Sequence, residues 1–227
     1  MAPGRFNDTP PPSHWPSEII YLTKPRLSAR FPPSLTPLLL PSSSTTVTTF
    51  APRPFKHPSH LTIKRVVDKS HPAFGQFGLF ANKKIKDDEL VIPYLGVLHV
   101  TLAPVDDDDA TSTVATEEDE HSSSDYDISL LRMSASDPRN PFGADGEKGG
   151  RHISIGVDAA QMGNAARFIN DYRGVRPSGP NSEFRMGRGE GGEARMEIWT
   201  LKGKGGVGKG EEILVSYGKA WWGARKG

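Results

Sequence analysis

Apolar and polar residues alternate over short stretches from Leu61 onward, with the period of two that is typical of β-strands. The first stretch, LTIKRVVD at 61–68, is followed by a glycine-containing turn. Residues 79–100 then predict short strands interrupted by a polar turn at 86–89. Further strands are predicted at 124–133, 152–159, 193–202 and 211–218. Residues 159–171, AAQMGNAARFIND, are rich in alanine and predict one short helix. The pattern therefore predicts a β-rich α+β domain.

The segment before this pattern has a different composition. Residues 1–58 hold 13 of the 20 prolines and a single glycine, together with a Ser/Thr run at 42–49. Proline interrupts regular backbone pairing, so we expect a largely disordered extension over 1–58. Within it, the apolar stretches 18–23 and 35–40 could add an edge strand and an anchor to the domain.

A second polar tract interrupts the predicted domain, which we place at 59–227. Residues 106–127 carry ten acidic side chains and no lysine or arginine. The low hydrophobicity and high charge of this tract predict a disordered insertion at about 104–124. Outside 106–127 the chain holds 28 basic and 17 acidic residues. That balance favours an acidic or chromatin-associated partner, although an ordinary solvated surface explains it equally well.

Composition excludes several kinds of chemistry. The 227 residues include no cysteine, which excludes disulfides, cysteine-ligated zinc, iron–sulfur clusters and thiol nucleophiles. No apolar run approaches the length of a membrane span, and the first residues lack the features of a signal or transit peptide. We therefore expect a soluble intracellular protein, nuclear or cytoplasmic, without a membrane partner.

One glycine-rich motif resembles a phosphate-binding loop. Residues 203–210, GKGGVGKG, differ from the G-x-x-x-x-G-K-[ST] pattern at Gly210, which stands where the Mg²⁺-binding hydroxyl is required. That pattern also needs a helix after the loop, whereas residues 211–218 predict a strand. A hairpin loop is favoured, and nucleotide binding is the weaker alternative.

Four motifs occur in a fixed order along about 61–222. Their combination indicates a protein family more specifically than any single motif does. They are FGQFGLFANKKIKDDELVIPYLG, SDYDISL, IGVDAAQMGNAARFINDYRGVRPSGPNSEF and GKGEEILVSYGKAWW. Together they resemble the SET-domain protein lysine methyltransferases. The resemblance implies several small twisted sheets, short helices and a C-terminal pseudoknot. It also implies methyl transfer from S-adenosylmethionine to a lysine side chain of a protein, with a histone tail of chromatin as one candidate.

The resemblance also assigns roles to residues. Tyr217 matches the catalytic tyrosine, and Tyr94 and Tyr126 match tyrosines of the channel that admits the lysine. The residues expected to bind the cofactor are Phe77, Gly78, Arg167, Asn170, Asp171 and Trp222. We expect no metal and no sequence-specific binding of nucleic acid. Each assignment has an ordinary alternative, such as a core tyrosine for Tyr217 or a helix cap for Asn170.

These residue types suit the implied chemistry. The lysine amine must be neutral to attack, and a narrow apolar channel favours the neutral form by desolvation. Aromatic walls still accept a methylated ammonium through cation–π contact. The cofactor supplies the reactive sulfonium, and the protein positions the two reactants.

The chain also departs from the family pattern. Asp171 stands where the family has histidine, Gln76 stands where it has the first glycine of its turn, and no cysteine-rich flank is present. These departures leave open a non-catalytic SET-like module that binds a protein or serves as a scaffold. Val215 leaves the number of transferred methyl groups undetermined.

Overall fold

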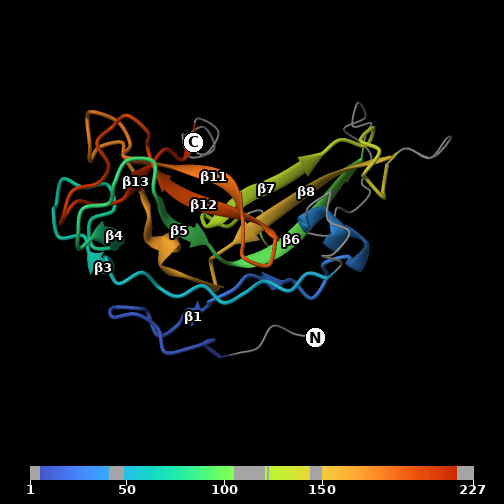
Figure 1. Cartoon of the computed structure of the whole chain (residues 1–227), viewed down its shortest axis with the longest axis horizontal. Coiled ribbons are helices and arrows are strands. Elements are labelled where there is room, and N and C mark those ends of the chain that lie inside the picture. Colours follow the sequence, from blue (N-terminus) through green and yellow to red (C-terminus); the bar gives the residue numbers. More distant parts are fainter. Residues whose placement is uncertain (1–5, 41–48, 105–120, 122, 144–149, 219–227) are drawn as a thin grey trace.

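The computed structural model describes residues 6–40, 49–104, 121, 123–143 and 150–218. In chain order its elements are β1 (Ile20–Tyr21), β2 (Arg26–Leu27), the 3₁₀ helix η1 (Pro33–Leu39), β3 (Leu61–Arg65), β4 (Phe77–Ala81), β5 (Leu90–Tyr94), β6 (Val97–Pro104), β7 (Asp127–Met133), β8 (Arg151–Asp158), β9 (Met162–Gly163), the 3₁₀ helix η2 (Ala165–Phe168), β10 (Asn170–Asp171), β11 (Ser182–Arg188), β12 (Ala194–Thr200) and β13 (Leu214–Val215). Several small sheets and short helical turns make up the fold (Figure 1). The predicted β-rich fold class is confirmed.

Two sheets form most of the structure. One has the order β2-β6-β8-β7 and extends to the right in Figure 1, and the other has the order β11-β12-β5. Strands β6 and β8 pair antiparallel from Val97 opposite Asp158 to Pro104 opposite Arg151. Alternate β8 side chains, Ile153, Ile155 and Val157, are buried, as the period of two predicts. Three two-stranded pairs, β1-β9, β3-β4 and β10-β13, complete the structure.

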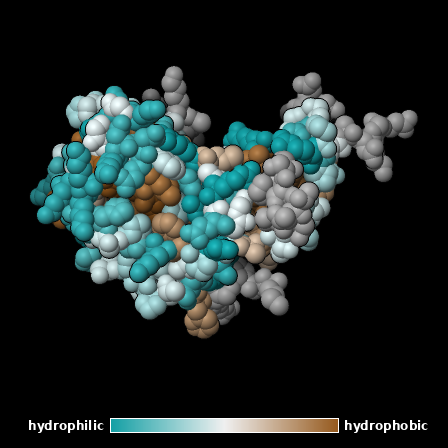
Figure 2. Space-filling model, in the orientation of Figure 1, coloured by the Kyte–Doolittle hydropathy of each residue, from teal (hydrophilic) through white to brown (hydrophobic). Residues whose placement is uncertain are grey.

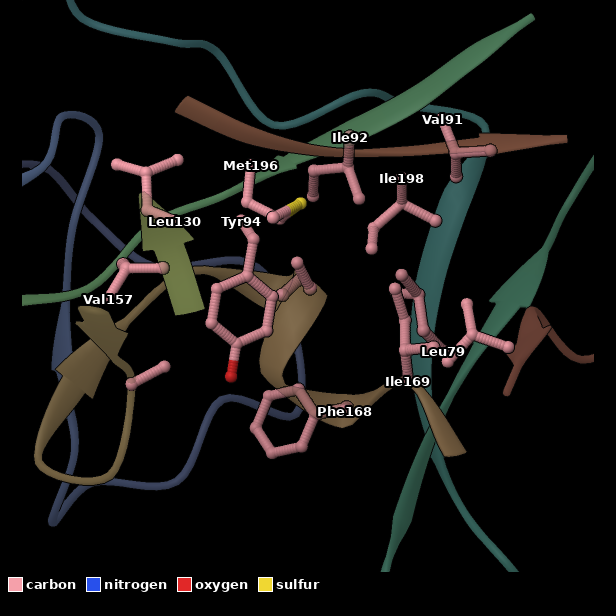
Figure 3. Close-up of a cluster of buried hydrophobic side chains, with 14 of the residues drawn as sticks. Leu79, Val91, Ile92, Tyr94, Leu130, Val157, Phe168, Ile169, Met196 and Ile198 are labelled. Carbon is pink, nitrogen blue, oxygen red and sulfur yellow. The ribbon is translucent and has the colours of Figure 1, made fainter. Parts of the chain in front are cut away.

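The hydrophobic core joins residues from both sheets and from the pairs around them. Figure 3 shows Ile92 of β5 and Ile198 of β12 close to Leu79 of β4, with Ile169 beside them. Ile92, Ile198 and Leu79 are completely buried. Burial of a side chain of this size stabilises the fold by roughly 1.5–3 kcal/mol. The core therefore fixes the ends of β4 and β5 beside η2.

The predicted helix over 159–171 is wrong for most of its length. Only Ala165–Phe168 form a helical turn, and it is a 3₁₀ helix. The residues on each side pair with distant strands, since Met162 lies opposite Ile20 and Asn170 lies opposite Leu214. Tertiary pairing overrides the local helix propensity of the alanines. The Asn164 side chain caps the turn and also donates to the Pro93 carbonyl, at 2.8 Å, which ties η2 to β5.

The N-terminal segment differs from the expected largely disordered extension. Its described residues contain β1, β2 and η1, and Leu22, Leu35 and Leu39 are completely buried. Strands β1 and β2 lie parallel to β9 and β6, so their backbone groups have partners although prolines stand nearby. The short strand and the anchor expected within 18–23 and 35–40 are both confirmed.

The predicted acidic insertion at 104–124 lies mostly outside the described residues. Strand β6 ends at Pro104, and the description resumes with His121. In the part of the chain that the structure describes, no helix is long and apolar enough to cross a membrane.

The glycine-rich segment forms turns. Gly203, Gly205 and Gly206 have φ near +75°, in the left-handed region that glycine adopts readily. Val207 then pairs with Ile85 in an isolated bridge, and the next regular element is the strand β13. The segment is a loop, as predicted, but it does not close a hairpin, because β12 pairs with β11 and β5 whereas β13 pairs with β10. The phosphate-loop alternative is wrong, because a strand and not a helix N-terminus follows the turns.

Candidate active site

The C-terminal segment is held on two sides, and this places Tyr217. The Ile213 amide donates to the Leu79 carbonyl of β4 at 2.8 Å. On the other side, the Asn181 side chain donates to the Glu212 carbonyl and accepts from the Leu214 amide, at 2.7 and 2.8 Å. Asn181 is 1% exposed, so its amide forms a buried clamp on the segment.

Tyr217 follows β13 with its phenol half-buried. Its hydroxyl donates to the Ile169 carbonyl at 2.6 Å, and its amide donates to Asp171 Oδ2 at 2.7 Å. Burial, with a smaller effect from the charge of Asp171, raises the pKa of Tyr217 far above its ordinary value. The phenol therefore stays neutral at physiological pH.

Tyr94 ends β5 and lies in the core. Figure 3 shows its ring among Met196, Val157 and Phe168, and the residue is 5% exposed. Its hydroxyl donates to the Tyr126 carbonyl at 2.8 Å. Burial raises the pKa of Tyr94 well above its ordinary value, and the charges of Arg167, Tyr217 and Tyr126 also act on it. The three predicted tyrosines therefore lie within electrostatic range of one another.

Arg167 lies on the tyrosine side of the site. It is 8% exposed, and its Nε donates to the Ala159 carbonyl at 2.8 Å. Its guanidinium carbon is 4.1 Å from the centre of the Tyr126 ring and 5.0 Å from that of Phe168. These contacts make Arg167 a support for Tyr126, and its predicted contact with the cofactor stays a prediction.

Phe77, Gly78 and Asn170 gather around a buried carboxylate. Asn170 Nδ2 donates to Glu212 Oε1 at 2.7 Å and to the Phe77 carbonyl at 3.3 Å. A side chain on Gly78 would overlap the same carboxylate oxygen. The other oxygen, Glu212 Oε2, lies 3.1 Å from His71 Nε2. Gly78 has no side chain and so lets the Glu212 carboxylate approach closely. Phe77, Gly78, Asn170, Glu212 and His71 together form one polar cradle.

Two members of this cradle, Glu212 and His71, were not predicted from the sequence. Glu212 is the second glutamate of the Gly-Glu-Glu motif, and the motif by itself indicated no role for it. His71 lies 141 positions away in the chain and carries no local signal. Only the fold brings the two together.

Asp171, the residue that departs from the family, is turned toward the C-terminal segment. Besides the Tyr217 amide it accepts from the Arg173 amide at 2.8 Å, and its Oδ2 forms an ion pair with Arg173 at 2.9 Å. Asp171 is 7% exposed, so these contacts compensate a buried charge. Trp222, the remaining predicted residue, lies outside the described residues.

Two hollows accompany these groups. Figure 2 shows an apolar recess over the region that β5 and β13 occupy in Figure 1, rimmed by hydrophilic side chains. A separate cavity of about 550 Å³ is lined by His14, Trp15, Pro16, Lys64, Arg65 and Phe77. This volume is within the range of small-molecule sites, about 300–1,000 Å³. Phe77 belongs both to the cavity and, through its carbonyl, to the cradle.

The comparisons with known proteins identify the family. The model of the SET domain matches residues 76–218, more than half of the chain, and this range includes all three tyrosines and the cradle residues Phe77, Gly78, Asn170 and Glu212. The chain belongs to the SET-domain family. SET domains are the catalytic domains of protein lysine methyltransferases, which use S-adenosylmethionine.

Solved structures also show similarity. The polycomb repressive complex 2 of Chaetomium thermophilum matches with 24% identity and a TM-score of 0.41, over 70% of this chain and 15% of that chain. The autoinhibited ctPRC2 bound to S-adenosylmethionine matches with 25% identity and a TM-score of 0.40, with the same coverage. The chain thus spans about 15% of the length of these neighbours. No curated protein matches the chain.

Proposed function

We propose that this protein is an S-adenosylmethionine-dependent protein lysine N-methyltransferase, with histone tails as one candidate substrate. The observation that supports this most strongly is the grouping of the three tyrosines. The Tyr94 hydroxyl donates to the Tyr126 carbonyl, and Tyr217 lies within electrostatic range of both and of Glu212 in the cradle. All of them lie within the range that matches the SET domain.

The tyrosines suit the transfer step. The amine of the substrate lysine must lose its proton, and burial among aromatic rings disfavours its charged form. Tyr94 and Tyr217 stay neutral because burial raises the pKa of each phenol. Neutral phenols orient the amine through hydrogen bonds without holding it as an ammonium. The methylated product, which is charged, can still contact the Tyr126 ring through a cation–π interaction.

The cradle suits the cofactor, which supplies a methyl group on a sulfonium when bound. S-adenosylmethionine carries an ammonium, a carboxylate and an adenine ring. Asn170 and the Phe77 main chain offer an amide and a carbonyl, and Glu212 offers a carboxylate. Trp15 and Phe77 offer aromatic faces at the neighbouring cavity, with Arg65 beside them. This donor set fits the cofactor, and we assign Phe77 and Asn170 to its binding, with Gly78 making room for Glu212 beside them.

The first test is binding, followed by transfer. Calorimetric titration of the purified protein with S-adenosylmethionine and with S-adenosylhomocysteine should give a saturable heat for both. We expect Tyr217→Phe to bind the cofactor within about twofold of the wild type. The same substitution should lower methyl transfer to a lysine-containing protein by roughly 10² to 10⁴-fold, the contribution typical of a positioned polar group.

The outcome separates the two candidate functions. A folded protein that binds neither compound would favour the non-catalytic SET-like module, for which the exchange of histidine for Asp171 is the specific observation. Unchanged transfer by Tyr217→Phe, with the wild type active, would exclude the role assigned to this hydroxyl.

A further inference from the structure

Four titratable side chains form a stacked cluster on the β2-β6-β8-β7 sheet, and the proposed reaction does not use them. His99 Nε2 lies 2.8 Å from Asp127 Oδ1, and His121 Nδ1 lies 2.7 Å from Asp158 Oδ2. The two imidazole rings stack, with centroids 4.0 Å apart and planes 25° apart. The name stacked cluster is used below for His99, His121, Asp127 and Asp158.

The stacked cluster is built into the sheet. Its side chains are between 6% and 27% exposed, so these His–Asp pairs have limited access to solvent. His99 on β6 lies opposite Gly156 on β8, and a side chain at Gly156 would overlap both His99 Nε2 and Asp127 Oδ1. Because Gly156 on β8 has no side chain, His99 on β6 can reach Asp127 on β7 across the middle strand. Burial of such groups costs free energy unless they are paired, as they are here.

The same cluster holds the segment that carries Tyr126. Asp158 Oδ1 accepts from Ser124 Oγ at 2.7 Å, and Ser124 Oγ accepts from the Tyr126 amide at 3.1 Å. The Tyr126 carbonyl accepts from the Tyr94 hydroxyl at 2.8 Å and from the Ala159 amide at 3.2 Å. Both main-chain groups of Tyr126 are therefore fixed through Asp158 and the residue after it.

The ring of Tyr126 is fixed from another element. Arg167 of η2 faces it at 4.1 Å and donates to the Ala159 carbonyl. Asp127, the next residue after Tyr126, is the partner of His99, and His121 lies five residues before Tyr126. The stacked cluster thus ties both His121 and Asp127, which stand on either side of Tyr126 in the chain, to the sheet.

We propose that the stacked cluster positions Tyr126 and, through its carbonyl, the Tyr94 hydroxyl in the lysine channel. The proposal rests on the proposed function, because the channel has a role only if lysine enters it. The four residues are positioning residues that touch no reacting atom. Their loss should loosen segment 121–127 and the lysine channel while the cofactor cradle at Asn170 and Glu212 stays intact.

The test compares variants of the full chain. His99→Ala removes both the stacking and the pair, His99→Gln keeps a donor that can reach Asp127, and Asp127→Ala removes the acceptor. Asp137→Ala is the matched control, since Asp137 is 23% exposed, against 27% for Asp127, and is paired with Arg139. Hydrogen–deuterium exchange is followed in peptides that cover 123–131. Methyl transfer is measured with core histones and with poly-L-lysine, and binding of S-adenosylmethionine by calorimetry.

We expect exchange in 123–131 to accelerate at least tenfold in His99→Ala and Asp127→Ala. We also expect kcat/KM for the lysine substrate to fall at least tenfold while the Kd for the cofactor stays within twofold. His99→Gln should recover part of both losses, and Asp137→Ala should behave as the wild type. A merely structural role would instead change cofactor binding and transfer together.

Unchanged exchange in both variants would overturn the proposal, and so would accelerated exchange with unchanged kcat/KM. If His99→Ala does not fold, Asp127→Ala tests the proposal instead. Asp127 is the most exposed of the four side chains, so its removal should disturb folding least. A wild type that neither binds cofactor nor methylates either probe contradicts the proposed function instead. The exchange data then decide by themselves whether the cluster holds Tyr126.

Discussion

At the scale of single residues, Asp171 explains how the chain keeps a tyrosine in place without the histidine of its family. Its carboxylate accepts from the amides of Tyr217 and Arg173 and pairs with the Arg173 guanidinium. A carboxylate at this position can serve two amides and a cation at once, because an ionised carboxylate is only an acceptor. Asp171 therefore anchors the C-terminal segment.

Removal of this anchor should be costly. We expect Asp171→Ala to lower the free energy of unfolding by about 2–4 kcal/mol, since it leaves two amides and a partly buried guanidinium without their acceptor. Asp171→Asn keeps an amide oxygen for Tyr217 and should cost less. Urea denaturation measures both, and methyl transfer should fall in the same order. Equal stability of Asp171→Ala and wild type would contradict the anchor.

At the scale of elements, the N-terminal strands extend the domain. Strand β1 supplies a parallel partner to β9, and the segment carries Trp15, whose ring meets Phe168 of η2 edge to face at 5.4 Å. Phe168 also meets Phe77 at 5.6 Å. A segment expected to be largely disordered thus supports two elements of the candidate site.

The contribution of this segment can be measured at Leu22, which is completely buried. Leu22→Ala should lower the free energy of unfolding by about 2–5 kcal/mol, the range for deletion of a buried leucine side chain. The control is Val67→Ala, because Val67 is 79% exposed and its truncation should stay within about 0.5 kcal/mol. Chemical denaturation, followed by tryptophan fluorescence, measures the free energy of unfolding of both variants. A Leu22→Ala protein as stable as its control would mean that the segment docks without stabilising the fold.

At the scale of the whole molecule, the neutral tyrosines link the stability of the fold to pH. Burial raises the pKa of both Tyr94 and Tyr217 above their ordinary value of 10.0. The unfolded chain releases these protons near pH 10, whereas the folded chain retains them. Their stabilising effect is therefore complete below about pH 10 and is lost as the pH rises toward the folded pKa.

Comparison with a phenylalanine variant isolates this effect. Between pH 10 and 11 the free energy of unfolding of the wild type should fall more steeply than that of Tyr217→Phe, by roughly 1 kcal/mol per pH unit. Urea denaturation at closely spaced pH values measures the two slopes, and lysine titration cancels between them. Parallel slopes would show that Tyr217 ionises as easily in the folded chain as in the unfolded one.

The sequence by itself determined the class of the fold and the identity of the tyrosines. Alternation with a period of two is a local property, and β6, β8 and β12 keep it, so their strands were predictable. The ordered motifs around Tyr94, Tyr126 and Tyr217 were equally local, and they were enough to indicate the family.

Tertiary structure alone decided which groups meet. His71 and Glu212, or His99 and Asp127, stand far apart in the chain, and only the tertiary fold brings each pair within 3.1 Å or less. Strand pairing also replaced the predicted helix over 159–171 by a single 3₁₀ turn, and the tertiary fold buried Leu22, Leu35 and Leu39 of the proline-rich N-terminal segment. The physical reason is that a local pattern reports which side of an element is apolar, whereas the partner of each element depends on the free energy of the whole packed structure.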